Sequence, residues 1–463
     1  MAGASILNTV ASQLEVVMPD IQEINAAEND QLYGRVKATN KVEKISRYLL
    51  RWVLETQIGG NMAKVSANGG SSGVLPPGTQ INQTYLLAGY FTGSIAFRLT
   101  DEQTKVVGST QAIVDITARQ TAKAMIAQQS YDDVTFAQDG TGILTNPSSA
   151  SSSTTLTFAA STDSLGVNML FEGMCVDVWD STGATKRALG TGAPLQITSI
   201  DYESKVVTFD QTVTGITTTD IIAFQAMTVY GPTTLTSFNS TYPGTQGGSP
   251  AGGIGGDSWR HGYRYFTNTN SSNYFYGKQK STVPQLNPVA VNANNDSLQW
   301  EHGLRIIAKI QQKRPQKEAW RKLEGIAHTT QKAAAFELGM SISQKLLSGT
   351  EFGTSLNLVP SNQDNADTFN FAGIPCNQST RQDRSSIDFI NFEKIGRAEA
   401  AETGPYTRGD GGGTQFEVRD SATGQPVTAY DWFYNSYYEN VCFDPGAFAR
   451  LYNLANPSSQ WDA

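Results

Sequence analysis

Cysteine is scarce in this sequence, and its scarcity excludes two kinds of site. The 463 residues include only three cysteines, Cys175, Cys376 and Cys442, which lie far apart in the chain. Neither a disulfide framework nor a CxxC metal knuckle follows from that spacing. Because free cysteine is among the most buried residue types, we expect three buried thiols in a reducing compartment.

Histidine is equally scarce, which removes the usual general base. None of the three histidines, His261, His302 and His328, lies in an HExxH motif or a GxSxG nucleophile elbow, so a structural role is expected for each. The glycine-rich stretches at 252–256 and 409–413 lack the lysine of a phosphate-binding loop. The sequence therefore predicts no catalytic residue, no cofactor-binding residue, no cofactor and no metal ligand.

Charge is low as well. Charged residues make up only 16% of the chain, against about a quarter in an average globular protein, and the net charge is -8. A sequence-specific nucleic-acid binder usually carries a basic footprint, and none is visible here. A mildly acidic surface is still compatible with a wall around packaged nucleic acid that it does not bind tightly.

Long hydrophobic runs are also missing. Residues 1–20 lack the basic stretch followed by an apolar run that marks a secretory signal. No stretch reaches the ~20 apolar residues that are needed to span a bilayer. We therefore expect a protein that is made in the cytoplasm and has no membrane partner.

Glycine is abundant, and six of the 43 glycines lie between two β-favouring runs, Tyr48–Thr56 and Thr84–Leu99. The turn formers between the runs are Gly59, Gly60, Gly69, Gly70, Gly73, Pro76, Pro77 and Gly78. This pattern predicts a two-stranded ribbon with a loose tip, each arm reaching roughly 60 Å at ~3.3 Å per residue. A ribbon of that length cannot bury both faces within its own subunit, so it needs partners.

The clearest early helix is expected over 109–129, a stretch with neither glycine nor proline. It would be about 30 Å long at ~1.5 Å per residue. The segment 136–144 follows it, and Asp139-Gly140 within that segment is a turn signal.

A serine- and threonine-rich run at 148–155 is expected to be a linker into an all-β module over 155–225. The apolar residues that indicate three strands are Val176, Val178 and Trp179, then Leu195, Ile197 and Ile200, then Val206, Val207 and Phe209. The residues 201–204 are the expected hairpin turn. The simplest interpretation is a small barrel or sandwich, inserted into another domain and able to fold alone.

Residues 231–296 are rich in Gly, Ser, Asn and Tyr, which predicts a long ordered loop. Its aromatic cluster is Tyr263, Tyr265, Phe266, Tyr274, Phe275 and Tyr276. Two interpretations stay open. Loop packing or subunit contact is favoured because aromatic residues are enriched at interfaces, and stacking of sugars or unpaired bases is the alternative.

Helix is expected again over 301–347, bent or divided at Gly325. Its apolar stripe, one residue in every four, is Ala334, Leu338, Ile342 and Leu346. A last helix is predicted after Asp444-Pro445, which has the pattern of an N-cap followed by proline at the first helical position. Its apolar residues would be Phe448, Leu451 and Leu454.

The order of these pieces resembles the major capsid proteins of tailed bacteriophages, which have the Hong Kong 97-type fold. In that family an extended arm precedes a ribbon called the E-loop, the spine helix of the peripheral (P) domain and often a GDGTG-like turn. This sequence has Asp139-Gly140-Thr141-Gly142 after its helix, and Gln138 departs from the pattern. The residues 371–375 resemble the strand that leads into the axial (A) domain, and 437–454 resemble the closing strand.

The resemblance implies an α+β chain with a small all-β module inserted into the capsid fold. The implied parts are an N-terminal arm (1–47), the E-loop ribbon (48–101), the P-domain spine helix (102–150), a β-barrel-like insertion (151–226), a long Gly/Asn/Tyr-rich surface loop (227–300), a helical part of the A and P domains (301–358), and the A-domain core with closing P-domain strands (359–463).

The implied function is self-assembly, through hexamers and pentamers, into the icosahedral shell of a virion that encloses phage double-stranded DNA, without enzymatic activity. The implied partners are further copies of the chain, portal and scaffolding proteins, a decoration protein and DNA held non-specifically, with assembly in the bacterial cytoplasm. We also expect a separate scaffold and no large N-terminal cleavage. Two alternatives stay open: an encapsulin-like cellular compartment shell, and a β-rich carbohydrate-binding or hydrolytic protein with a sugar cleft.

Overall fold

The chain folds into helices and several separate sheets, as the α+β class requires. The computed structural model describes residues 32–39, 41–46, 49–57, 82–89, 91–100, 123–124, 126–148, 151–158, 166–180, 187, 195–225, 259–271, 274–314, 319–335, 338, 368–406, 416–419 and 426–455. The chain divides into two compact units. The first comprises Met1–Gly34, Tyr90–Val134 and Glu399–Tyr438, and the second comprises Arg35–Gly89, Thr135–Ala398 and Glu439–Ala463.

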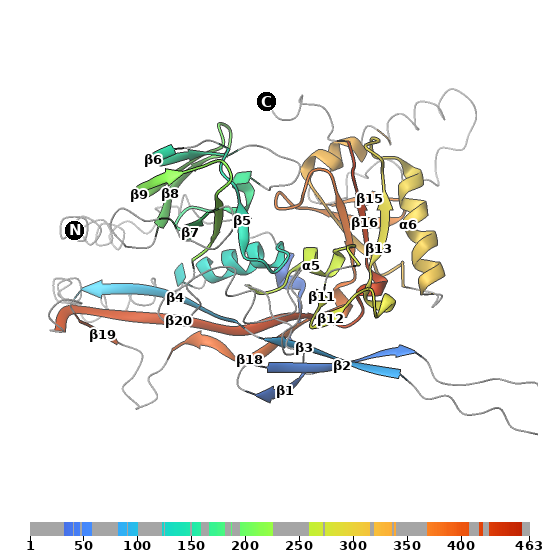
Figure 1. Ribbon diagram of the computed structural model, residues 1–463, viewed down its shortest axis with the longest axis horizontal. Helices are drawn as coiled ribbons and strands as arrows, with labels where there is room; N and C mark the ends of the chain where they lie inside the picture. The colour runs from blue at the N-terminus through green and yellow to red at the C-terminus, as the bar shows by residue number, and fades with distance from the viewer. Residues whose placement is uncertain are drawn as a thin grey trace, which may run out of the picture. The chain divides into compact units, whose positions relative to one another are not determined.

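A sheet built on one long strand dominates the described part of the first unit (Figure 1). Its strands are β4 (Phe91–Thr100), β18 (Ile395–Pro405), β19 (Phe416–Arg419) and β20 (Pro426–Cys442). β20 pairs antiparallel with β4 from Ala429↔Thr100 to Tyr438↔Phe91. Cross-strand partners hold the pair together: Phe97 stacks on Trp432 at 6.0 Å, and Arg98 forms a bidentate ion pair with Asp431 at 2.7 and 2.9 Å.

The predicted ribbon is found at its base, where β2 (Leu49–Gln57) pairs antiparallel with β3 (Asn82–Gly89). β1 (Glu43–Ser46) completes a three-stranded sheet. The expectation of one continuous run over 84–99 is wrong, because β3 ends at Gly89 and β4 pairs with β20 instead. A partner so far along the chain leaves no local trace in the sequence. The ribbon tip lies outside the described residues.

Helical residues run from 123 to 136, beyond the end expected at 129. Inside this helix Gln128 donates to Asp132 at 2.7 Å. The expected turn follows, with Thr141 donating from both its backbone N and its Oγ1 to Asp139 and with Gly140 at a φ of 88°. The beginning of the predicted helix lies outside the described residues.

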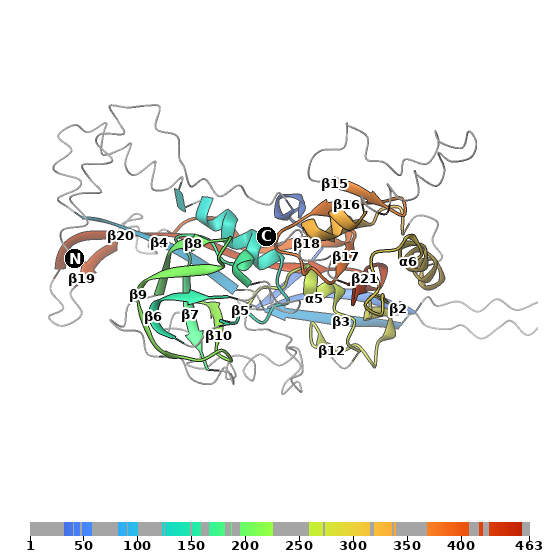
Figure 2. The same cartoon turned by 90° about the horizontal axis from the view of Figure 1, so that it is seen from above.

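The second unit contains a six-stranded sheet in the order β5-β10-β7-β8-β9-β6, which is strongly curved in Figure 2. Its strands are β5 (Ile143–Thr145), β6 (Ser151–Thr157), β7 (Cys175–Trp179), β8 (Leu195–Asp201), β9 (Val206–Ile216) and β10 (Ile221–Phe224). The three strands predicted here and the turn between β8 and β9 are confirmed. The linker is wrong: most of that run is β6, where threonine is a good strand former and Leu156 is buried.

A second six-stranded sheet of mixed direction forms the other core of this unit, in the order β13-β21-β17-β14-β16-β15. Its strands are β13 (Val289–Asn292), β14 (Glu324–Ala327), β15 (Thr368–Phe371), β16 (Ile374–Gln378), β17 (Ile387–Ile390) and β21 (Ala449–Tyr452). Helix α6 (Trp300–Lys313) runs alongside β13 and packs Ile306 and Ile310 into this core (Figure 1).

The helix expected over 301–347 is confirmed at 300–313 and 329–335, with strand β14 between these two stretches, and the helix expected after Asp444 is wrong. Gly325 lies in β14, where a side chain would place its Cβ 2.4 Å from the Cys376 Sγ, so the glycine permits close strand packing and does not bend a helix. After Asp444, only the 3-10 turn η5 (Pro445–Ala447) forms, and Leu451 lies in β21. Asp444 makes no side-chain cap and binds Arg314 instead.

The described half of the predicted surface loop is also not a loop. It contains α5 (Tyr263–Thr267), β11 (Tyr274–Phe275), β12 (Lys278–Gln279) and the 3-10 turn η3 (Pro284–Leu286). The remaining 3-10 turns among the described residues are η1 (Tyr33–Arg35), η2 (Gly166–Met169) and η4 (Phe392–Lys394). No helix in the described part is long and apolar enough to cross a membrane.

The close approach of the chain at Gly262 predicts a stability effect. A Cβ at this position would lie 2.2 Å from the Phe136 backbone oxygen, whereas at Gly34 it would meet nothing within 4 Å. We expect Gly262→Ala to lower the free energy of unfolding by at least about 2 kcal/mol, because backbone has to move. Gly34→Ala should leave it almost unchanged. Thermal unfolding of both variants checks this, and equal midpoints would contradict it.

Candidate functional site: a buried polar core and an exposed ribbon face

The three histidines are held in structural hydrogen bonds. His261 is buried, with its Nδ1 2.8 Å and its backbone N 2.9 Å from the same Glu439 oxygen, and its ring lies 4.0 Å from that of Tyr265. His302 forms a capping box at the start of α6, and burial lowers its pKa. His328 is buried and bonded to Thr330. The structural role predicted for each histidine agrees with these contacts.

The three cysteines are free thiols, two of them buried and Cys175 half-buried. Burial raises the pKa of each thiol, and at Cys175 the charges of Asp210 and Asp177 raise it further. A raised thiol pKa means little reactive thiolate at neutral pH. Within the described residues, no group of His, Cys, Asp and Glu could hold a metal ion.

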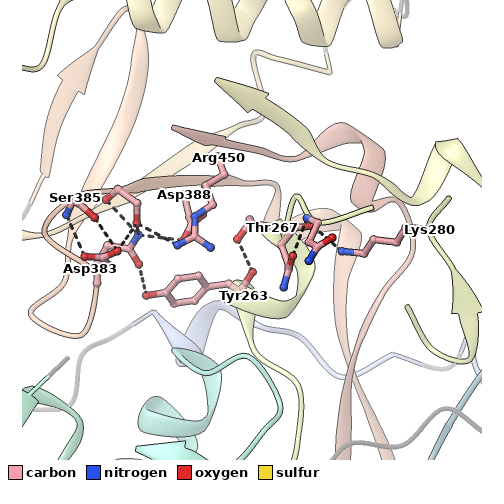
Figure 3. Close-up of polar contacts among 11 residues, drawn as sticks. Tyr263, Thr267, Lys280, Asp383, Ser385, Asp388 and Arg450 are labelled. Carbon is pink, nitrogen blue, oxygen red and sulfur yellow. Dashed lines mark hydrogen bonds and ion pairs between the residues drawn. The ribbon is translucent and has the colours of Figure 1, made fainter. Parts of the chain in front are cut away.

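A buried polar network ties α5 to the turn before β17 and to β21 (Figure 3). The Tyr263 hydroxyl donates to Gln382 at 2.8 Å, and the Gln382 amide donates to Asp388 at 3.0 Å. Arg450 lies 3.7 Å from Asp388 and is its counter-charge. Asp383 accepts from Ser385 at one edge of the network. The residues at its centre are buried, so the network fixes the packing of these elements and has no exposed group to offer a substrate.

The aromatic cluster around α5 is the core of this region. Tyr265, Phe266, Phe275 and Tyr276 are all buried, with Tyr265 and Phe275 stacked at 5.3 Å. The Tyr276 ring also meets Trp52 of the ribbon base edge-on at 4.7 Å. Because sugar or base stacking needs an exposed ring face, the packing interpretation is the one that fits these residues. The predicted surface loop is corrected accordingly for 259–300.

The ribbon base presents one buried and one exposed face. Leu50, Trp52, Leu86 and Ala88 are buried on the inner face. On the outer face Val53 and Tyr85 are direct cross-strand neighbours, 48% and 51% exposed. Arg51 lies over the Tyr85 ring at 5.1 Å and pairs with Glu43 at 2.6 Å. The outer face therefore combines an apolar pair with a fixed charge pair.

Sequence reasoning located the ribbon but did not single out these two residues. The signal was available in the alternation of Leu50 and Trp52 with Arg51 and Val53, which assigns the two sets to opposite faces. Only the structure shows which set the subunit buries.

Comparisons with known proteins give matches in structure alone. No protein family matches the chain, and no curated protein matches it in sequence. The Cyanophage A-1(L) capsid asymmetric unit is similar at 10% identity and a TM-score of 0.43, covering 91% of this chain and 90% of that one. The capsid of the native GTA particle is similar at 7% identity and a TM-score of 0.39, covering 90% and 88%. A structure from Gordonia phage Cozz is similar at 8% identity and a TM-score of 0.35, covering 92% and 87%.

The first two of these structures are capsids. With TM-scores below 0.5, function has to be argued from the geometry of the chain itself.

Removing one side of the buried ion pair should destabilise the fold. Asp388 is fully buried, so Arg450→Met leaves a carboxylate without its counter-charge, and we expect a loss of about 3 kcal/mol in the free energy of unfolding. Lys322→Met breaks a matched but exposed pair with Glu393 and should change little. Denaturant unfolding measures both, and an equal effect of the two variants would be inconsistent with the network's role.

The thiols should be protected in the folded protein. With a small disulfide reagent at mildly alkaline pH, Cys376 and Cys442 should stay unmodified and Cys175 should react slowly, because burial raises the pKa of all three. In denaturant all three should react at once. Rapid labelling of Cys376 or Cys442 in the native protein would show that the core is not closed around them.

Proposed function

We propose that this chain is the major capsid protein of a tailed bacteriophage, whose copies assemble through hexamers and pentamers into an icosahedral shell around double-stranded DNA. The observation that carries this proposal is the ribbon base. One of its faces is buried in its own subunit, while the other exposes Val53 and Tyr85 side by side. The exposed face of such a ribbon is buried when it packs against the surface of a neighbouring subunit.

The energetics favour repeated contacts of this type. Burying one large apolar side chain is worth about 1.5–3 kcal/mol, so the exposed pair supplies a useful fraction of a contact but not a stable dimer alone. In a closed shell each copy both gives and receives a ribbon, and stable interfaces of this kind bury thousands of Å². The Arg51–Glu43 pair beside the apolar pair would fix the register of the contact.

The parts of the chain can be assigned on the same basis. In this proposal the β4–β20 sheet and the 123–136 helix form the P domain, and the β13–β17–β21 sheet with α6 forms the A domain. The six-stranded sheet from β5 to β10 is the inserted module, which we place on the outer face of the shell, where extra mass does not crowd DNA.

Composition supports the partners we propose. A chain with net charge -8 would line a DNA-filled shell without binding the DNA tightly. Other partners in this proposal are the portal protein, a separate scaffolding protein and a decoration protein, with assembly in the host cytoplasm and a final place in the virion.

Charges on the outer ribbon face should block assembly. Electron microscopy of the full-length protein produced together with the other head proteins should show closed shells. Val53→Glu with Tyr85→Glu should leave unassembled subunits with an unchanged circular dichroism spectrum, because a buried unpaired carboxylate is costly. Leu304→Glu is the matched control, since Leu304 on α6 is equally exposed at 52%.

Three outcomes of this experiment distinguish the proposed ribbon contact from the proposed capsid role. Shells from the control but not from the double variant support the ribbon contact. Shells from both variants would refute the contact while leaving the capsid role intact. Only monomers or dimers from the unaltered protein would refute the capsid role itself.

A further inference from the structure

A buried lysine, Lys280, and a half-buried one, Lys313, donate to the C-cap carbonyls of short helical segments in the second unit. Lys280 donates from its Nζ to the Asn268 carbonyl, the C-cap of α5, at 2.6 Å, and it is labelled in Figure 3. Lys313, the last residue of α6, donates to the carbonyl of Asn287, the C-cap of η3. The Asn287 amide donates in turn to the Lys280 carbonyl at 3.2 Å. The two amines therefore link α5, the segment 278–287 and α6.

Within the described residues, no carboxylate acts on Lys280. Its Nζ lies 5.7 Å from the Phe275 ring, and the charged or titratable groups that act on it are the Cys442 thiol of β20 and the Lys313 amine of α6. Lys313 is acted on by Arg314 and by Asp444, and that carboxylate is already paired with Arg314 at 2.8 Å. A helix-end carbonyl attracts a cation, but a dry site disfavours the charge.

We propose that Lys280 and Lys313 form a proton-operated latch, which loosens the packing of segment 278–287 against α5 and α6 when the two amines bind protons. The latch goes beyond the proposed function and does not depend on it. The supporting geometry is the buried Lys280 amine, the half-buried Lys313 amine, the two C-cap carbonyls and, within the described residues, the lack of a carboxylate at Lys280.

The direction of the response follows from the proton balance. Burial lowers the pKa of Lys280 from 10.5 to about 7, and burial and Arg314 lower that of Lys313 to about 8. When the segment opens, each amine regains its ordinary pKa and takes up a proton. Between about pH 7 and pH 10.5, protonation of Lys280 alone makes the equilibrium constant for opening of the segment rise about tenfold for each unit by which the pH falls. Below about pH 7 both states are protonated and the response is flat.

Hydrogen exchange of the full-length protein, followed by mass spectrometry, tests the latch. Peptides covering 263–292 and 300–314 should be at least about tenfold better protected at a pH near 9 than near 7, after correction for the intrinsic exchange rate. Lys280→Met should remove most of this difference, because it keeps the stem and removes the titrating group. Lys278→Met, two residues away and half-buried, is the matched control and should retain the difference.

The possible outcomes decide the proposal. An equal pH response in the unaltered protein and Lys280→Met, or no response in either, would overturn it. If Lys280→Met does not fold, the unaltered protein labelled with carbon-13 lysine gives an independent answer. A lysine side-chain resonance that titrates near pH 7 supports the latch, and titration of every lysine near its ordinary value of about 10.4 refutes it.

Discussion

Backbone hydrogen bonding over long sequence separations is the constraint on which this fold depends. β20 is longer than any other strand described here, and its partner β4 lies far back in the chain, with Arg98 and Asp431 separated by 333 residues. A strand inside a sheet must have its N–H and C=O groups paired, so neither strand is stable before the other arrives. Such non-local pairing makes folding slow, since the loop-closure entropy is lost before the contacts form.

The same strand also supplies the polar anchors of the second unit. Its residues beyond Tyr438 include Glu439, which accepts from His261, and Asn440, whose amide donates to the His261 carbonyl at 2.8 Å. A buried carboxylate that accepts two hydrogen bonds fixes the backbone around it more strictly than apolar packing does. The ribbon base rests on this region, because Leu87 donates to the Tyr276 carbonyl at 3.2 Å. The position of the ribbon base within the second unit therefore depends on the aromatic core around α5.

The elements that local periodicity and turn chemistry determine were predicted correctly from the sequence. The alternation of Leu195, Ile197 and Ile200 located β8, and the turn chemistry of Asp201 located the hairpin, where the Asp201 side chain accepts from Ser204 at 2.6 Å. The errors arose where distant packing decides. The helical stretch predicted over 301–347 is divided at Gly325, but by the strand β14, because the contact that requires the glycine, with the Cys376 sulfur of a neighbouring strand, lies 51 residues away in the chain. Leu451 was assigned to a helix although β13 and β17 pair with it as a strand.

Composition, like periodicity, could not predict the distant packing of the aromatic segment 259–276. Glycine, asparagine and tyrosine together are typical of an ordered loop, and no periodicity in 259–276 distinguishes a surface loop from a core built of short elements. The buried Lys280 could not be found from sequence either, because a lysine is normally exposed. Its amine donates to the Asn268 carbonyl and lies beside the Phe275 ring, and within the described residues no carboxylate acts on it. Proton binding and local opening are therefore coupled at this amine.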